Sequence, residues 1–386
     1  MSAFENELEK SLAALRSQNL LRNPRVSTRI PGPYFELDGQ RKICLCSNNY
    51  LGLAAHPELL SAVSAGIHKH GAGAGAARLV SGSQTVHREA ERELAAWVSQ
   101  DDSLLFTSGY AANVGALQAL VGEGDLIVSD ALNHASLIDG CRLSRAHVVV
   151  VPHCDAGAVR EALRTNRGEA RRAMVVTESV FSMDGDSPNL VALRSICDEF
   201  DAGLYVDEAH ALGVFGPKGS GMCALFHVKP DVLMGTLGKS LGLSGAFVSG
   251  SEAVRSTLQN HARSYVFSTG ISPAIADGAR VAIALAMAAD GPRATLQQHA
   301  TRLREQVSKL GFQIPAGTSP IIPVLIGAPD AALTVSNALW ERGVFVQAIR
   351  PPTVPVGSSR LRVVPIATHS EKDIDDALSA FREAVK

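Results

Sequence analysis

The sequence carries almost no excess charge of either sign and no long apolar run. Its formal net charge is −2 over 386 residues, which removes any electrostatic reason to expect binding to nucleic acid or to an anionic membrane. No stretch of about 18 apolar residues occurs, so a membrane-spanning helix is not expected. The segment from Met1 to Glu7 lacks the basic and apolar regions of a signal peptide. We therefore expect a cytoplasmic protein without nucleic-acid or membrane partners.

Cysteine is also scarce, and its spacing predicts neither disulfides nor a metal site. The sequence contains six scattered cysteines and no CxxC pair. Cys44 and Cys46 are separated by one residue, and small apolar positions in a strand explain them better than a metal pair. This usage is typical of a reducing compartment, which supports the cytoplasmic prediction.

What remains is the composition of an enzyme-sized globular chain. Hydrophobic residues make up 46% of the sequence, enough for a large buried core. From about residue 58, short apolar strands alternate with helices, which predicts a mainly parallel α/β sheet covered by helices on both faces. The last hundred residues change to a compact α+β pattern. The predicted parts are an N-terminal arm helix and hairpin (1–45), a large cofactor-binding domain (46–285) and a small C-terminal domain (286–386).

The two ends of the chain contain clear local signals. An arm helix with one face packed on something else is predicted from four apolar residues at helical spacing: Phe4, Leu8, Leu12 and Leu15. Asp38-Gly39 lies between two alternating segments and predicts a hairpin. The segment from Ser370 to Asp373 has the pattern of a capping box and predicts the start of the last helix.

Two predicted strands end in residues that suit pyridoxal phosphate chemistry. Lys239 follows an apolar strand that breaks into a Gly-punctuated loop, and Asp207 ends the apolar run from Gly203. In such enzymes a lysine amine forms a Schiff base with the cofactor aldehyde, and an acid pairs with the ring nitrogen. Purely structural roles for both residues are the plainer alternative.

A nucleotide triphosphatase is another alternative for the same segments. Asp207 to His210 spells a helicase motif, and Gly238 to Ser240 spells the end of a phosphate-binding loop. That loop requires a glycine five residues before Gly238, where this chain has Leu233. The pattern therefore fails.

Two further strand ends are candidate ligand positions. Ser108 to Ala111 follows a strand and opens a helix, so its backbone N–H groups suit a phosphate, although an ordinary capped helix has the same pattern. His134 follows the strand that ends at Asp130, at the edge where open α/β sheets bind ligands. An imidazole there can lie flat against a pyridine ring, whereas a surface or core histidine is the ordinary alternative.

Two other patterns are less specific indicators of a ligand site. The Gly71–Gly82 segment breaks the dinucleotide fingerprint at Ala76, so we expect a flexible wall near the ligand. Asp184 and Asp186 imitate a calcium loop, but Ser195 stands where an acid is needed. No metal is therefore predicted.

A proline-rich loop near the C-terminus is a candidate substrate contact. The loop from Pro351 to Pro355 is followed by Arg360 and Arg362, and a guanidinium beside a rigid loop can hold a carboxylate bidentately. For Arg360 we favour a solvated strand end with salt bridges.

These motifs together resemble the α-oxoamine synthases, fold-type I (aspartate aminotransferase-like) pyridoxal phosphate enzymes that condense an amino acid with an acyl thioester. The resemblance runs from about Leu12 to the C-terminus. It is carried by the segments Ser47–Leu53, Thr177–Asp186, Val206–His210 and Gly235–Lys239. Asn49 replaces the usual Asp, and Ala76-Ala77 replaces a frequent Gly-Ser pair.

The resemblance implies a role for each matching residue. Lys239 is expected to hold the cofactor, Asp207 to face its ring nitrogen, and His134 to stack on the ring. The other implied cofactor contacts are the ring hydroxyl for Ser182 and His210, the phosphate turn for Gly109 and Tyr110, the phosphate or lysine loop for Thr236, and the partner subunit's phosphate for Thr269. The implied substrate contacts are the amino-acid carboxylate for Asn48 and Arg362, and the acyl-donor side for Arg22 and Thr353.

Within that family, the segment Ala348–Pro355 resembles the biotin-pathway branch. This implies decarboxylative condensation of L-alanine with a pimeloyl thioester, carried by coenzyme A or an acyl-carrier protein, in a homodimer with shared active sites. The alternatives are a glycine C-acetyltransferase, a serine palmitoyltransferase, an aminotransferase, and a non-catalytic partner subunit, which would be expected to lack Lys239.

Overall fold

The computed structural model describes residues 2–384, which divide into two compact units. The first unit contains the described residues of Met1–Ser47, Met183–Gly185 and Thr295–Lys386. The second unit contains Asn48–Ser182 and Asp186–Ala294. Among the described residues, no helix is both long enough and apolar enough to cross a membrane.

A seven-stranded sheet organises the second unit, in the order β3-β9-β8-β7-β6-β4-β5. β9 runs antiparallel to both of its neighbours, and the other neighbouring pairs are parallel. The prediction of a mainly parallel sheet is therefore confirmed. The strands are β3 Asp102–Phe106, β4 Leu126–Asp130, β5 His147–Val151, β6 Ala173–Glu178, β7 Gly203–Asp207, β8 Val232–Thr236 and β9 Ala246–Gly250.

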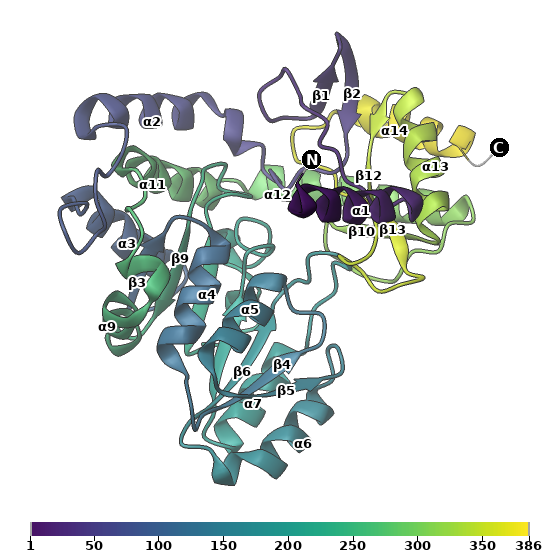
Figure 1. Cartoon of the computed structure of the whole chain (residues 1–386). Helices are drawn as coiled ribbons and strands as arrows, with labels where there is room; N and C mark the ends of the chain where they lie inside the picture. Colours follow the sequence, from purple (N-terminus) through teal and green to yellow (C-terminus); the bar gives the residue numbers. More distant parts are fainter. Residues whose placement is uncertain (1, 385–386) are drawn as a thin grey trace. The chain divides into compact units, whose positions relative to one another are not determined.

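Helices cover both faces of this sheet, because alternate strand residues point to opposite sides. Leu104 and Phe106 pack in a cluster with α4 and α5, whereas Leu105 packs in another with α3 and α11 (Figure 1). The helices of this unit are α2 Pro57–His70, α3 Thr85–Trp97, α4 Gly109–Leu120, α5 Ala135–Ser144, α6 Ala156–Asn166, α7 Leu190–Glu199, α8 Met222–Leu225, α9 Glu252–His261, α10 Arg263–Val266 and α11 Pro273–Met287, with short 3₁₀ turns at Leu53–Ala55, Arg167–Glu169 and Pro217–Gly219.

The first unit has an α+β core of its own. Leu303, Leu339 and Phe381 are fully buried and pack from three helices against Val363 of the sheet β10-β13-β12. A second small sheet has the order β1-β2-β11. The elements are α1 Ala3–Ser17, β1 Tyr34–Leu37, β2 Gln40–Cys44, β10 Ile322–Gly327, α13 Pro329–Glu341, β11 Val344–Phe345, β12 Gln347–Ile349, β13 Ser359–Val363 and α14 Glu371–Ala384; α12 Asp290–Lys309 begins in the second unit and continues into this one.

The local signals at the chain ends behave as predicted. Asp38 and Gly39 have φ values of 51° and 73°, as a two-residue hairpin turn requires, and they connect the antiparallel strands β1 and β2. At the start of α14, the Asp373 carboxylate accepts the Ser370 N–H at 2.8 Å, and the Ser370 hydroxyl accepts the Asp373 N–H at 3.1 Å. These reciprocal bonds satisfy donors that the first helical turn leaves unpaired.

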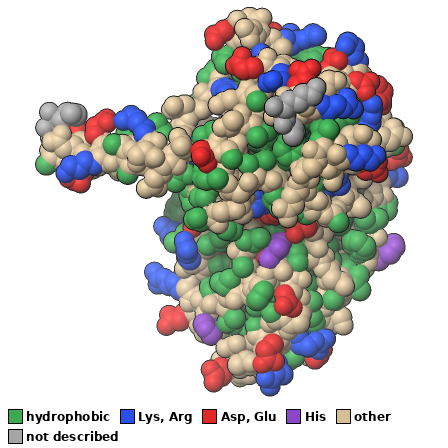
Figure 2. All heavy atoms as spheres, turned by 90° about the vertical axis from the view of Figure 1, so that its right-hand side faces the viewer, with side chains coloured by type: hydrophobic (Ala, Val, Ile, Leu, Met, Phe, Trp, Pro, Cys, Tyr) green, Lys and Arg blue, Asp and Glu red, His purple; other side chains and the backbone are tan. Residues whose placement is uncertain are grey.

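Helix α1 forms as predicted, but none of its residues is buried. A capping box between Ser2 and Glu5 starts it. Phe4 and Leu8 expose 71% and 49% of their surface, so the apolar face has no cover in the isolated chain. Figure 2 shows the projecting N-terminal arm, with apolar, acidic and basic side chains on its surface.

Truncating Leu233 tests the central sheet. Leu233 lies in β8 and is only 1% exposed, so Leu233→Ala should lower the free energy of unfolding by about 2–5 kcal/mol through lost burial and a cavity. Urea unfolding followed by far-UV circular dichroism measures the change. Leu143→Ala is the matched control because Leu143 is 57% exposed on α5, and its effect should stay within about 0.5 kcal/mol. Equal losses in both variants would contradict the assigned core.

Candidate active site

Lys239 lies in a tight turn that follows the carboxyl end of β8. The Thr236 hydroxyl oxygen accepts the Gly238 N–H at 3.1 Å, which ties the strand end to the turn. Gly242 completes the turn with a φ of +69°, and a Cβ at this position would lie 2.3 Å from the Ala54 amide nitrogen. Both the positive φ and the close approach require glycine, so the backbone around Lys239 has little freedom to move.

The ring of His210 joins Lys239 to the buried interior. Its Nε2 lies 2.7 Å from Lys239 Nζ, and its Nδ1 lies 2.7 Å from the Tyr50 hydroxyl oxygen. When the lysine ammonium donates to Nε2, Nδ1 carries the ring proton and donates to Tyr50. Tyr50 is completely buried, so this contact holds the imidazole in one orientation.

Asp207, the last residue of β7, presents a buried carboxylate that is 5% exposed. One oxygen accepts the Ala209 N–H at 2.9 Å, and the other accepts the Asn113 side-chain amide at 2.8 Å. The Tyr205 hydroxyl donates to Asn113 Oδ1 at 2.8 Å, which turns the amide N–H₂ toward Asp207. The negative charge is therefore held in a fixed place by directed donors.

The same network continues to His134. The Asn113 amide also donates to the Ser136 hydroxyl oxygen at 2.8 Å, and that oxygen lies 2.7 Å from His134 Nδ1. The Ser136 N–H points at the same nitrogen from 3.2 Å, so Nδ1 is an acceptor. Burial lowers the pKa of His134, with Asp207 opposing and Lys239 adding to this shift. The imidazole is therefore neutral near pH 7.

Glu178 is a second buried acid at this edge of the sheet. It ends β6, is 3% exposed, and accepts the His134 N–H at 2.7 Å. Burial raises the pKa of Glu178 to about 8, and the charge of Asp207 adds to the shift. Two carboxylates at one strand edge disfavour double ionisation, so Glu178 tends to hold a proton.

The predicted phosphate turn is the N-terminus of α4. Ser108 caps the helix, with its hydroxyl oxygen accepting the Ala111 N–H at 3.1 Å. In the described part of the chain, the N–H groups of Gly109 and Tyr110 have no acceptor. Two open donors at the positive end of a 12-residue helix fit an anion.

Thr269 is tied to the Gly-rich segment by backbone contacts. An isolated bridge pairs it with Ala77, and the Gly270 N–H donates to the Ala76 carbonyl oxygen at 2.9 Å. A Cβ on Gly82 would lie 2.1 Å from that same carbonyl oxygen, so the segment packs closely against itself. These contacts make the stretch from Ala76 to Gly82 a packed strap beside Thr269. A Cβ at Gly73 or Gly75 would meet nothing within 4 Å, so the flexible wall stays a prediction for that part.

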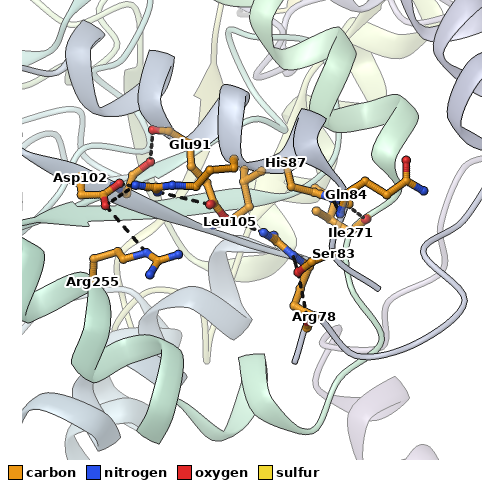
Figure 3. Close-up of polar contacts among 11 residues, drawn as sticks. Arg78, Ser83, Gln84, His87, Glu91, Asp102, Leu105, Arg255 and Ile271 are labelled. Atoms are coloured by element: carbon orange, nitrogen blue, oxygen red, sulfur yellow. Dashed lines mark hydrogen bonds and ion pairs between the residues drawn. The ribbon is translucent and has the colours of Figure 1, made fainter. Parts of the chain in front are cut away.

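A buried ion pair anchors this strap to the sheet (Figure 3). Arg78 donates to Glu91 at 3.0 Å, and the same Glu91 oxygen accepts the Leu105 N–H at 3.1 Å. His87 Nδ1 accepts the Gln84 N–H at 3.0 Å, which leaves the proton on Nε2 for the Ile271 carbonyl oxygen at 2.9 Å. Burial lowers the pKa of His87, in agreement with this neutral form.

A second charged cluster includes Asp186, four residues after the predicted site residue Ser182. The His153 ring nitrogens donate to Asp130 at 2.8 Å and to Asp186 at 2.9 Å. Burial opposes charge on the ring, but the bonds to the two acids outweigh it and raise the pKa of His153 to about 12. The triad joins the end of β4 to the loops that follow β5 and β6.

That cluster has the spacing of a metal site but not its chemistry. One donor atom each from Asp130, His153 and Cys154 lies within 4.8 Å of the others. An imidazolium has no lone pair for a metal, because both ring nitrogens carry protons. The ion triad therefore accounts for the geometry without a cation.

The first unit holds three of the predicted substrate residues, of which two are in contact. Arg22 donates to the Thr353 hydroxyl oxygen at 3.1 Å and to the Pro351 carbonyl oxygen at 3.3 Å. These bonds attach the N-terminal linker to the proline-rich loop. Arg362 lies on β13 and is 5% exposed, whereas Asn48 belongs to the second unit, so their shared role stays a prediction.

The expectation for Arg360 was partly wrong. It does form a salt bridge, to Asp184, but it is only 4% exposed and is not a solvated strand end. The long-range ion pair compensates the burial, and a sequence spacing of 176 residues gave no sign of it. Asn49, which departs from the usual Asp, accepts the Ala54 N–H at 3.2 Å through its Oδ1.

Several residues of this site carried no role in the sequence prediction. Asn113, Tyr50 and Glu178 lie within predicted segments, but nothing local marks them as partners of Asp207, His210 and His134. Glu178 is the one with a usable signal, since it is an acid at the end of an apolar strand, as Asp207 is.

A family model and the relatives of known sequence or structure place this chain among related enzymes. The family model for aminotransferase class I and II matches residues 40–381. An 8-amino-7-oxononanoate synthase of Citrifermentans bemidjiense is 44% identical over 390 residues, which cover 100% of this chain and 99% of that protein. One of Anaeromyxobacter dehalogenans is 45% identical over 372 residues, covering 96% and 93%. The solved serine palmitoyltransferase of S. paucimobilis with bound PLP–myriocin aldimine has a TM-score of 0.93 at 27% identity and covers 100% of this chain and 98% of its own.

Removing the Asn113 amide tests the network around Asp207. Asn113→Ala should lower the free energy of unfolding by about 1–3 kcal/mol, because the buried Asp207 carboxylate and Tyr205 hydroxyl lose a partner. Chemical denaturation measures this loss. Asn260→Ala, at an exposed position of α9, is the control and should change stability by less than about 0.5 kcal/mol. A loss at Asn113 no larger than the control would show that this network contributes little.

Proposed function

The chain belongs to the aminotransferase class I and II family and, within it, to the 8-amino-7-oxononanoate synthases, and on this basis we propose the reaction that it catalyses. L-Alanine condenses with a pimeloyl thioester to give 8-amino-7-oxononanoate, carbon dioxide and the free thiol. The product is an intermediate of biotin biosynthesis.

One observation carries the proposal. The amine of Lys239, the imidazole of His210 and the carboxylate of Asp207 come together at the carboxyl ends of β7 and β8, in a chain with full-length similarity to synthases of this reaction. Parallel sheets bind ligands at this edge. The relatives that are 44–45% identical over nearly the whole chain are 8-amino-7-oxononanoate synthases, which favours the biotin-pathway branch.

The residues present fit pyridoxal phosphate as the cofactor. When bound through a lysine amine, this group supplies an electron sink for negative charge at the α-carbon of the amino acid. The open N–H groups of Gly109 and Tyr110 suit its phosphate, together with Thr236 and, from the partner subunit, Thr269. The neutral ring of His134 suits stacking, and Ser182 and His210 suit the ring hydroxyl.

Asp207 sets the charge that the reaction requires. Its carboxylate is held by directed donors, and an opposite charge at close range typically raises the pKa of a ring nitrogen by about 1–3 units. Asp207 would thus keep that nitrogen protonated when the cofactor is bound. Since Glu178 shares this strand edge with a raised pKa, the site carries one firm negative charge.

Lys239 moves the proton. Its amine takes the α-proton of alanine and returns it after loss of carbon dioxide, while His210 holds the side chain in place. Asn48 and Arg362 bind the alanine carboxylate, which helps to select the bond that breaks. Arg22 and Thr353 serve the acyl-donor side.

We also propose a cytoplasmic homodimer with shared active sites. Phe4, Leu8 and Leu15 expose apolar surface along α1, and a second copy of the chain is a natural cover for such a face. Thr269 then reaches the partner subunit's cofactor phosphate. The scattered cysteines, which form no disulfide among the described residues, fit a reducing compartment.

An assay of the purified holoenzyme tests the reaction directly. Release of thiol and of carbon dioxide should require both L-alanine and a pimeloyl thioester. The two products should be released in equal amounts. Formation of pyruvate from alanine without loss of carbon dioxide would instead indicate an aminotransferase.

Replacing Lys239 tests the assigned base and anchor. Lys239→Ala should abolish turnover, because a positioned base alone is typically worth about 10²–10⁴-fold and the covalent anchor is lost as well. The visible absorbance of the bound cofactor should change at the same time. Lys229→Ala is the control, since Lys229 is a surface residue paired with Asp101. Turnover by Lys239→Ala near that of the unsubstituted protein would refute the assignment.

The acyl donor decides between branches of the family. With alanine, kcat/KM should be greater for pimeloyl than for acetyl or palmitoyl thioesters, since each buried methylene adds about 0.8 kcal/mol until the pocket ends. Steady-state rates for the three donors measure this order. A preference for acetyl donors with glycine would place the chain with the glycine C-acetyltransferases, and a preference for palmitoyl donors with serine would place it with the serine palmitoyltransferases.

A further inference from the structure

A cationic hollow lies on the first unit, and Arg350 is one of the residues that line it. Its volume is about 320 Å³, at the lower end of the roughly 300–1,000 Å³ typical of small-molecule sites. Three arginines line it, and the other lining residues are polar or apolar without charge. The full set is Arg16, Asn19, Leu21, Asn23, Arg25, Leu333, Ser336, Asn337, Gln347, Ala348 and Arg350.

The charges of this hollow are not balanced within it. None of its lining residues is acidic. Arg16 lies 3.8 Å from Glu9 on the surface of α1, but both side chains are more than half exposed, so this pair is weak. Among residues 2–384, neither Arg25 nor Arg350 takes part in an ion pair. The hollow therefore presents uncompensated positive charge.

Arg350 is the buried base of the hollow. It is 7% exposed, donates to the Asn19 carbonyl oxygen, and has a buried Nε without any hydrogen-bond partner in residues 2–384. Burial lowers the pKa of Arg350, and the neighbouring charge of Arg22 adds to the shift. A buried guanidinium without an acidic partner is costly, and an anion bound in the hollow would compensate its charge.

Arg25 is held in place at the rim. Its guanidinium donates to Asn337 at 3.2 Å and lies 4.0 Å above the centre of the Trp340 ring. A stacked and hydrogen-bonded arginine keeps its remaining donors in a fixed fork, which suits phosphate geometry. The hollow thus has a buried and a fixed guanidinium rather than loose surface charges.

We propose that this hollow binds the phosphate of the arm that carries the acyl thioester. The inference rests on the proposed function, in which the substrate is delivered on such an arm. Arg22 joins the hollow to the acyl-donor side, because it donates to the Arg350 carbonyl oxygen at 3.4 Å and to Thr353 at 3.1 Å. Coenzyme A and acyl-carrier proteins both present their thioester on an arm with a phosphate, so the shared ligand chemistry is a phosphate ester.

Donors with and without phosphate test the proposal. Rates with L-alanine are measured for pimeloyl-coenzyme A, a pimeloyl carrier protein and the pimeloyl thioester of N-acetylcysteamine, which lacks phosphate. Arg350→Gln should raise KM about tenfold for a phosphate-bearing donor, the loss of one charge-assisted contact, and leave KM for the phosphate-free donor within about twofold. A rise with coenzyme A or with the carrier protein identifies the natural source of the phosphate.

Matched variants separate binding from structure. Arg25→Gln should show the same selective rise in KM while it leaves the buried Arg350 unchanged. Arg350→Lys, which keeps a positive charge, should raise KM less than Arg350→Gln does. Arg164 is an exposed arginine paired with Glu161 on α6, so Arg164→Gln should change KM for neither kind of donor. An equal rise for phosphate-bearing and phosphate-free donors, or no rise, would overturn the proposal.

A binding measurement keeps the inference distinct from the proposed reaction. Adenosine 3′,5′-bisphosphate, titrated calorimetrically into the holoenzyme, should bind the unsubstituted protein and bind Arg350→Gln about tenfold more weakly if coenzyme A is the source. This readout does not depend on turnover. If no donor is turned over with alanine, the proposed function fails, while the arginine-dependent titration still decides whether the hollow binds phosphate.

Discussion

The hydrogen bonding of the buried Asp207 carboxylate is the constraint on which the candidate site at the sheet edge of the second unit depends. A charge that is 5% exposed is tolerated only with directed partners, and the Ala209 N–H and the Asn113 amide supply them. This requirement also orders the neighbouring side chains. Tyr205 orients Asn113, and the Asn113 amide donates a second hydrogen bond to Ser136. The position of His134 follows from this chain of donors and acceptors.

The charges around Asp207 are kept apart by different means. His134 is made neutral by burial, and Glu178 has its pKa raised to about 8, so neither competes with Asp207 as a fixed charge. His153 is charged, but Asp130 and Asp186 enclose it and keep its pKa at about 12. In the proposed reaction this leaves one firm negative charge at the strand edge, opposite the amine of Lys239. Burial alone would neutralise His134, Glu178 and His153. The bonds from His153 to two acids keep that group ionised.

The first unit uses arginine in two different ways. Arg360 is buried and compensated by Asp184, so it holds the fold together. Arg350 is equally buried, but its neighbour is another arginine and its Nε lacks an acceptor within the chain. The contrast between two arginines ten positions apart separates a structural charge from the one that is proposed to receive an anion.

The sequence by itself determined the features that depend on near neighbours in the chain. Apolar strands alternating with helices predicted the sheet, and Asp207 and Lys239 could be found because each lies beside its own strand end. The hairpin at Asp38-Gly39 and the cap at Ser370 follow from turn and capping chemistry over a few residues. Only the tertiary structure decided which side chains meet. Asn113 reaches Asp207 across 94 residues, and Tyr50 reaches His210 across 160. No local pattern encodes such contacts, because they arise from the order in which strands assemble in the sheet and from the need of buried polar groups to find partners there.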